Sequence, residues 1–139
     1  MRQLAWLHAT PKPPEGSRRA QQPQKQQLSR LEQLKKAGAV PPMPPNPAPH
    51  IFERLLEIGL TEAAGMGAVP ISWREISAWC ERTGIDLAPW EARLLRKLST
   101  EYLAEGRRAE AEGCPPPWRV EVSQQEIETE LDRLRMVLG

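Results

Sequence analysis

The sequence contains few of the residues that build catalytic or metal sites. Among its 139 residues there are 2 histidines and 2 cysteines, and neither Cys80 nor Cys114 belongs to a Cys-x-x-Cys pair. His8 and His50 have no cysteine near them in the sequence, and there is no glycine-rich phosphate loop or metal-spaced acidic cluster. Two cysteines cannot form a disulfide framework, so we expect reduced thiols. We further expect no enzyme activity, no cofactor and no bound metal.

Long apolar runs are also missing. No stretch of about 18 apolar residues occurs, so the sequence predicts no membrane span. Near the N-terminus, the apolar stretch from Leu4 to Ala9 is interrupted by His8 and is too short for the core of a signal peptide. The mean hydropathy of -0.56 is typical of a soluble chain. We therefore expect a cytoplasmic protein that makes no membrane contact.

Aromatic residues are scarce, with the exception of tryptophan. The chain has 5 Trp but only 1 Phe and 1 Tyr, and 40% of its residues are hydrophobic. This length and composition allow one domain with a small core. Since one tryptophan can bury roughly 200 Å², we expect the tryptophans to anchor either that core or an interface.

Charge and proline divide the chain into parts. Residues 1–50 carry eight Lys or Arg and two acids, whereas the remainder has eleven basic and sixteen acidic residues. Ten of the 15 prolines lie in the first 49 residues, where they prevent long helices. We predict a basic, Pro-rich and largely extended arm at 1–49 with a short helix at 28–37, a helical domain at 50–118, and a C-terminal helix at 119–139. The arm could bind nucleic acid, an acidic surface or the chain itself.

The clearest helical signals lie between Ser72 and Glu112. Ser72 to Glu75 fits a capping box, Gly84 suits the end of that helix, and Pro89 suits the start of the next one. The second helix is expected to run to about Glu112, with a polar last part that would project into solvent unless a partner covers it.

Weaker patterns surround this pair of helices. An apolar stripe predicts a helix at 50–58, and residues 65–70 are expected to form a loop because they contain two glycines and a proline. A second capping box at 123–126 opens a final segment with apolar residues at Ile127, Leu131, Leu134 and Leu138. This narrow stripe suits packing against one other helix.

These elements predict an all-α fold, a small helical hairpin or a bundle of three to four helices that follows the Pro-rich arm. Residues 73–98 also have the outline of a helix-turn-helix. Between Pro70 and Glu112, however, there are seven basic and eight acidic residues, whereas a DNA-reading surface requires a basic surplus. The charge argues against nucleic-acid binding by the folded part and favours a plain helical hairpin.

The helical pair is too small to form a core alone. It spans the 42 residues from Ser72 to Gly113, below the roughly 70 to 80 residues at which one core normally suffices. Something else must cover its apolar face: the helix at 50–58, the C-terminal segment, a second copy of the chain or another protein. We expect the following residues to be candidates for protein binding: Trp73, Trp79, Trp90, Leu94, Leu98, Tyr102 and Trp118.

Two proline-rich segments, 41–49 and 115–118, allow two interpretations. They could be ligands for an aromatic groove on another protein, or they could serve as a spacer and a helix stop. We favour the second interpretation.

Tryptophan spacing gives the sequence a family resemblance. The relevant residues are Trp73 with Ile76 and Trp79, Thr83-Gly84, Pro89-Trp90-Glu91, Leu98-Ser99 with Tyr102, and Pro116-Pro117-Trp118. From about Pro49 to Trp118 the chain resembles the tail assembly chaperones, small proteins encoded among the tail genes of tailed phages. Members often have Ser before the Pro-Trp-Glu, where this chain has Ala88, and loss of that cap costs about 1 kcal/mol.

The resemblance implies a non-catalytic role in phage tail assembly. A protein of this family is expected to bind the aggregation-prone tape measure protein in the host cytoplasm, to recruit tail tube subunits, and to leave before the virion is complete. Two alternatives stay open at this point: nucleic-acid binding through the basic arm, and a permanent structural place in the virion. The sequence also leaves open the oligomeric state and whether a frameshifted longer form exists.

Overall fold

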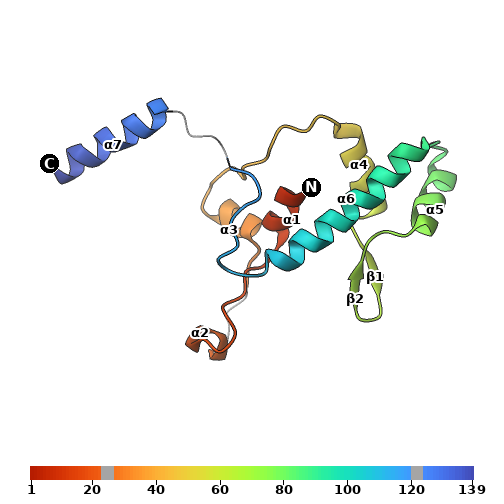
Figure 1. The fold of residues 1–139 in the computed structure, drawn as a ribbon, viewed down its shortest axis with the longest axis horizontal. Coiled ribbons are helices and arrows are strands. Elements are labelled where there is room, and N and C mark those ends of the chain that lie inside the picture. Colours follow the sequence, from red (N-terminus) through yellow and green to blue (C-terminus); the bar gives the residue numbers. More distant parts are fainter. Residues whose placement is uncertain (23–26, 120–123) are drawn as a thin grey trace.

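The structure is a computed structural model that describes residues 1–22, 27–119 and 124–139. Helices dominate these residues, and Figure 1 shows the long helix α6 near the centre of the molecule. The helices are α1 (Arg2–His8), α2 (Arg18–Gln21), α3 (Arg30–Lys36), α4 (Pro49–Ile58), α5 (Trp73–Thr83), α6 (Pro89–Arg108) and α7 (Gln124–Leu138). The short α3 lies within the range expected for a helix at 28–37.

A small antiparallel sheet makes the fold not strictly all-α. Strands β1 (Glu62–Ala64) and β2 (Gly67–Val69) pair in the register Glu62↔Val69, Ala63↔Ala68 and Ala64↔Gly67. The expectation of a plain loop at 65–70 is therefore wrong. Gly65 and Met66 form a two-residue connection, a length that closes hairpins tightly, and Gly67 has a φ of +139° that glycine adopts readily. Strands of three residues are too short to show an alternating pattern in the sequence.

One core forms where α4, α5 and α6 meet. Its buried members are Ile51 and Leu55 of α4, Ile71, Ile76 of α5, and Leu95 of α6. Leu55 and Leu95 are completely inaccessible to solvent. The helix predicted at 50–58 is α4, and it covers part of the apolar face of the α5–α6 pair.

The N-terminal residues cover the other end of α6. Helix α1 packs against α6 and α3 (Figure 1), and Ala5 and Leu7 are each only 1% exposed. The prediction of an extended arm is wrong for this segment, because residues 2–8 are helical and packed. A seven-residue helix is not stable alone in water, so α1 depends on this tertiary contact. At the same end, α6 stops at Arg108 instead of reaching Glu112, and Ala109 just beyond it is fully buried.

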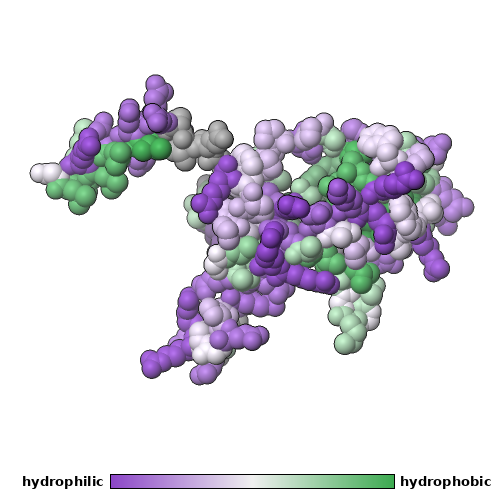
Figure 2. Space-filling model, viewed as in Figure 1, coloured by the Kyte–Doolittle hydropathy of each residue, from purple (hydrophilic) through white to green (hydrophobic). Residues whose placement is uncertain are grey.

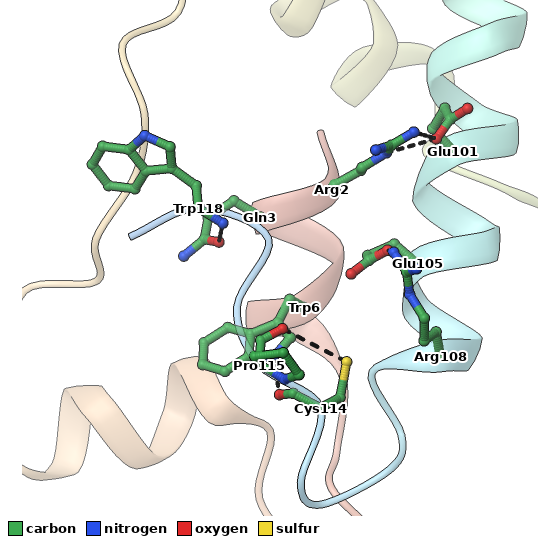
Figure 3. A network of polar contacts seen from close by, with 9 residues as sticks. All are labelled: Arg2, Gln3, Trp6, Glu101, Glu105, Arg108, Cys114, Pro115 and Trp118. Atoms are coloured by element: carbon green, nitrogen blue, oxygen red, sulfur yellow. Dashed lines mark hydrogen bonds and ion pairs between the residues drawn. The ribbon is translucent and has the colours of Figure 1, made fainter. Parts of the chain in front are cut away.

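Buried polar side chains of α1 hold two distant loops in place (Figure 3). The Gln3 side chain is 2% exposed, and its Nε2 donates to the Pro42 carbonyl (3.0 Å). Its Oε1 accepts from the Trp118 amide (3.2 Å). The indole Nε1 of Trp6 donates to the Cys114 carbonyl (2.9 Å). The Pro-rich linker and the 114–118 segment are therefore both attached to α1.

Arg30 is a buried cation that is bonded to main-chain carbonyls. Its guanidinium, 8% exposed as a residue, donates to the carbonyls of Trp6 (3.2 Å), Ala109 (2.6 Å) and Ala111 (3.0 Å). It also lies 4.5 Å from the centre of the Trp6 ring, within the range of a cation–π contact. Carbonyls at the end of a helix lack intrahelical partners and carry partial negative charge, so Arg30 both satisfies and neutralises the end of α6.

Other basic residues of the N-terminal segment pair with acids at the same end of the molecule. Three ion pairs join them: Arg2 with Glu101 (2.8 Å), Lys12 with Glu110 (3.3 Å) and Arg19 with Glu112 (2.9 Å). These groups are substantially exposed, so each pair contributes little to stability. They show that basic residues near the N-terminus contact acidic residues of α6 and of the segment that follows it.

Side-chain caps fix the helix ends around β1 and β2. Ser72 Oγ accepts from the Glu75 amide (3.2 Å) as the capping box requires, but the amide of Ser72 donates to Glu62 of β1 (3.1 Å) instead of to Glu75. The hairpin thus takes part in starting α5. At the other end, Gly84 adopts the left-handed conformation with a φ of +68°, which confirms its predicted role as a helix stop.

Ser99 ties α6 to both ends of the hairpin. This residue is fully buried; its Oγ donates to the Leu60 carbonyl (2.7 Å) and accepts from the Ile71 amide (2.9 Å). Leu60 precedes β1 and Ile71 follows β2, so one hydroxyl closes the chain segment that contains the sheet.

Helix α7 takes no part in the contacts described above among the described residues. Every one of its residues is exposed, and Figure 1 shows it beside the rest of the molecule. Ser123, which the sequence suggested as its capping residue, lies outside the described residues.

Candidate protein-binding surface

Two of the predicted binding residues are well exposed. Trp73, the first residue of α5, is 50% exposed, and Trp90 in the first turn of α6 is 58% exposed. Trp79 is only 9% exposed, and its indole N–H has no acceptor among the described residues. Trp79 is therefore packed in the interior, whereas the side chains of Trp73 and Trp90 are accessible to another polypeptide.

The four remaining candidates make contacts within the chain. Leu94 and Leu98 are partly buried against the core of α4, α5 and α6. Tyr102 is hydrogen-bonded to His8, and the amide of Trp118 is bonded to Gln3. The structure therefore does not bring the seven residues together into one surface.

An open groove follows α5 and the turn that connects it to α6. It has a volume of about 620 Å³, and Trp73 is one of its walls. Its apolar lining consists of Trp73, Ile76, Cys80, Ile85, Leu87 and Ala92. Ile76 is 3% exposed and belongs to the core, so the bottom of the groove is continuous with the packed interior. Such a surface suits the side chains of an apolar segment.

The polar residues of the groove give it a charge preference. Ser77, Glu81 and Asp86 also line it, and both charged residues among them are acidic. Trp73 is held from the α6 side by Arg96, whose guanidinium lies 5.4 Å from the centre of the indole ring. We expect the groove to favour apolar residues that are accompanied by Lys or Arg.

Trp90 does not line this groove. It precedes Ala92 by two residues on α6, and positions two residues apart point to nearly opposite sides of a helix. Sequence reasoning placed Trp73 and Trp90 in one set because both are tryptophans, and only the fold separates them.

Sequence reasoning did not select Ile85 or Leu87 as site residues. Both lie in the short connection between α5 and α6, where polar residues are common. Two apolar residues in so short a connection were the signal that this turn contributes to a surface. Cys80 and Ala92, by contrast, fit ordinary core positions and gave no signal.

A second concave region, of about 830 Å³, lies between the N-terminal segment and α3. Charged and amide side chains make up much of its lining, and they include Arg19, Gln33 and Glu112. Arg30 also lines it, but its guanidinium is already bonded to three carbonyls. Six of the ten residues that line the groove beside α5 are apolar, against four of the ten that line this region, so the groove beside α5 is the better candidate for binding a hydrophobic segment.

The described part of the chain holds no cluster of metal ligands beside these surfaces. Residues 1–22, 27–119 and 124–139 contain no group of three His, Cys, Asp or Glu side chains that could hold a metal ion. Cys80 and Cys114 are not joined by a disulfide. A search of the same residues finds no helix with the length and hydropathy needed to cross a membrane.

His8 and Tyr102 form the one contact between titratable rings that we find among the described residues. A hydrogen bond of 2.8 Å joins His8 Nδ1 to the Tyr102 hydroxyl, and the rings meet edge to face at 76°. Burial lowers the pKa of His8, and the positive charge of Lys35 lowers this pKa further. Burial also raises the pKa of Tyr102. The neutral form of His8 thus joins α1 to α6.

Stability is expected to fall as the pH drops below about 6.5, the ordinary pKa of histidine. The pKa of His8 is lower in the folded state than in the unfolded state, so the unfolded state binds more protons in this range. Melting temperatures measured between about pH 7.5 and pH 5.5 should therefore decrease more for the natural chain than for His8→Asn. Equal slopes for the two chains would contradict this role of His8.

The fold and the groove define a class: a small, mainly helical protein with an open apolar groove and no metal cluster in its described residues. The family model for "Phage tail assembly chaperone" matches residues 26–104, which is more than half of the chain. The chain therefore belongs to the phage tail assembly chaperone family, as the tryptophan spacing indicated. The matched segment begins before Pro49 and includes α3, and it ends before the Pro116-Pro117-Trp118 motif.

Neither the curated proteins nor the solved structures contain a significant match to the chain. Family membership gives a role in phage tail assembly, and it suggests that this role is not enzymatic.

Proposed function

We propose that the chain binds an apolar, helical segment of the tape measure protein during tail assembly in the host cytoplasm, and thereby keeps that segment from aggregating. The observation that carries the proposal is the apolar groove beside α5, with Trp73 half exposed at its wall. Large exposed aromatic residues next to a hydrophobic groove are typical of the centres of protein interfaces. Family membership supports a partner from the tail assembly apparatus.

The acidic groove residues define the client further. Glu81 and Asp86 stand beside the apolar lining, so a client helix with basic residues next to its apolar stripe would bind best. Charge complementarity of this kind raises the association rate and selects partners more than it raises affinity. Binding should therefore become slower at high salt, while the apolar contact persists.

The ion pairs of the N-terminal segment argue against the nucleic-acid alternative. Arg2, Lys12 and Arg19 are paired with carboxylates of their own chain, and the donors of Arg30 are bonded to carbonyls. Each group used in this way contributes less to the phosphate contacts on which nucleic-acid affinity depends. A protein client is thus the better-supported partner.

Co-expression with the tape measure protein of the same phage tests the proposal. We expect the tape measure protein to be soluble and to copurify with the full chain, and to aggregate when it is expressed alone. Tail tube protein in a parallel co-expression identifies the alternative client. Copurification with neither protein would contradict the proposal, and retention of the chain in purified virions would show a permanent structural part instead.

Replacing Trp73 with Ala is expected to weaken client binding about tenfold, because a half-exposed tryptophan at a groove is a typical interface hot spot. Binding is measured by titrating the chain into a labelled client segment. Met66→Ala is the matched control, since Met66 is fully exposed at the hairpin turn, away from the groove. Trp90→Ala tests whether the start of α6 contributes as well. Unchanged affinity for Trp73→Ala would place the client elsewhere.

A further inference from the structure

Helix α7 carries an apolar stripe that no other element covers. Ile127, Leu131, Leu134 and Leu138 follow one another at intervals of four, three and four residues, and the first three are between 45% and 53% exposed. Figure 2 shows this stripe as a green band along one side of α7, with charged residues in purple on the other side. These intervals are those of core positions d, a, d and a in a coiled coil.

A helix of this length needs a partner. In water, isolated helices shorter than about 12 to 15 residues are marginal, and α7 has 15 residues. Its internal ion pairs, Arg133 with Glu130 and Arg135 with Asp132, are exposed and add little. Half-exposed leucines along one face supply the missing stabilisation only when a second apolar stripe packs against them.

The charges of α7 are complementary to those of a second α7. The acids Glu126, Glu128, Glu130 and Asp132 occupy the first nine residues of the helix, and Arg133 and Arg135 follow. Two such helices in parallel would bring the two acidic halves together. In an antiparallel pair, the acidic half of each helix lies opposite the basic end of the other. The two helix dipoles then run in opposite directions, which is also favourable.

Residues beside the apolar stripe fit the antiparallel arrangement in detail. Glu128 and Arg135 both occupy position e, directly after a d residue, and antiparallel coiled coils bring e positions of the two helices together. With Leu131 opposite Leu134 of the second copy, Glu128 of each helix faces Arg135 of the other. The guanidinium side chain of Arg135 is 78% exposed and is therefore accessible for this contact.

We infer that α7 is a self-association helix, which pairs in antiparallel fashion with α7 of a second copy to form a two-fold symmetric dimer. The contact is only two heptads long, so the dimer is a weak one that forms and separates readily. Each dimer carries two grooves beside α5, one on each copy. The inference itself rests on α7 alone and does not require the proposed client.

Sedimentation equilibrium of the full chain without client tests the dimer. Between about 5 µM and about 500 µM, the average mass should rise from that of a 15.7 kDa monomer toward twice that value. Leu131→Glu should keep the chain monomeric throughout this range. Met136→Glu is the matched control, because Met136 is 85% exposed and lies off the stripe, and it should dimerise like the natural chain.

Charge reversal tests the orientation. Glu128→Arg and Arg135→Glu should each weaken self-association about fivefold, since each places like charges opposite one another twice per dimer. An equimolar mixture of the two variants should associate as well as the natural chain, because every e position then faces an opposite charge.

Three results would overturn the inference. They are a natural chain that is monomeric at the highest concentration, a dimer that persists in Leu131→Glu, and a mixture of the two charge variants that fails to associate. The melting temperature of the remaining fold should be unchanged in all variants, because no residue of α7 is buried. If the chain dimerises but binds no client, only the proposed function is contradicted. If the chain binds the client but stays monomeric, only the inferred dimer is contradicted.

Discussion

Replacement of Arg30 by Met is expected to lower the free energy of unfolding by about 3 kcal/mol. Methionine preserves much of the side-chain length but donates no hydrogen bonds, so the carbonyls of Trp6 and Ala109 lose the guanidinium donor, and the Ala111 carbonyl keeps only its bond from the Cys114 amide. The cation–π contact with Trp6 is lost as well. Urea unfolding followed by tryptophan fluorescence and by circular dichroism measures the change.

Two variants make this test specific. Arg30→Lys retains the charge, but an ammonium group lacks the planar fork that reaches several carbonyls at once, so most of the loss should remain. Arg18→Ala removes an exposed arginine from the same segment and should change stability by less than about 0.5 kcal/mol. If Arg30→Met were no less stable than Arg18→Ala, the docking of α1 on α6 could not depend on the guanidinium.

Ser99→Ala is expected to cost about 2 kcal/mol of stability. The substitution removes a small hydroxyl but leaves the Leu60 carbonyl and the Ile71 amide buried without that partner. Since these groups flank the β1–β2 hairpin, its amides should also exchange hydrogen faster in the variant. Urea unfolding measures the stability, and hydrogen exchange reports on residues 60–71.

The neighbouring Thr100 supplies the control for Ser99. Thr100 is exposed, and its hydroxyl bonds the Arg96 carbonyl of the same helix. Thr100→Ala should therefore alter stability by less than about 0.5 kcal/mol and leave hydrogen exchange in the hairpin unchanged. Similar losses in both variants would mean that Ser99 acts through helix propensity and not through its bonds to the loop.

Local signals in the sequence were sufficient to predict the central helices. Ser72 opens α5, Gly84 ends it in the left-handed conformation, and Pro89 opens α6. Each of these effects is determined within one turn of helix, by a hydroxyl, by the absence of a Cβ or by a missing amide hydrogen. The family could be recognised from this same region, because its tryptophan spacing is a local feature.

The candidate site was predictable only in part. Trp73 was one of the candidate binding residues and lines the groove, but nothing in the sequence distinguished it from Trp79, which is buried, or from Trp90, which lies outside the groove. Exposure depends on which other elements pack nearby, and those elements are distant in sequence. The groove residues Ile85 and Leu87 were overlooked although two apolar residues in a short connection are a local signal.

The end of α6 illustrates the same limit. Its polar last part suggested a frayed helix in need of a partner, and the structure supplies that partner from the chain's own N-terminus. Arg30 looked like one of several solvated cations of a basic segment, and Gln3 like an ordinary surface amide. Both are buried because α1 packs against α6 and α3, and α6 lies far from α1 in the sequence.

The sequence by itself determined both ends of α5, the start of α6 and the family, because these depend on caps, periodicity and residue types within short windows. Tertiary structure alone decided that a seven-residue N-terminal helix persists, that a short hairpin forms between α4 and α5, and which tryptophans face solvent. Each of these outcomes depends on contacts between residues far apart in the chain. Such contacts stabilise segments whose local preferences are too weak to hold a conformation by themselves.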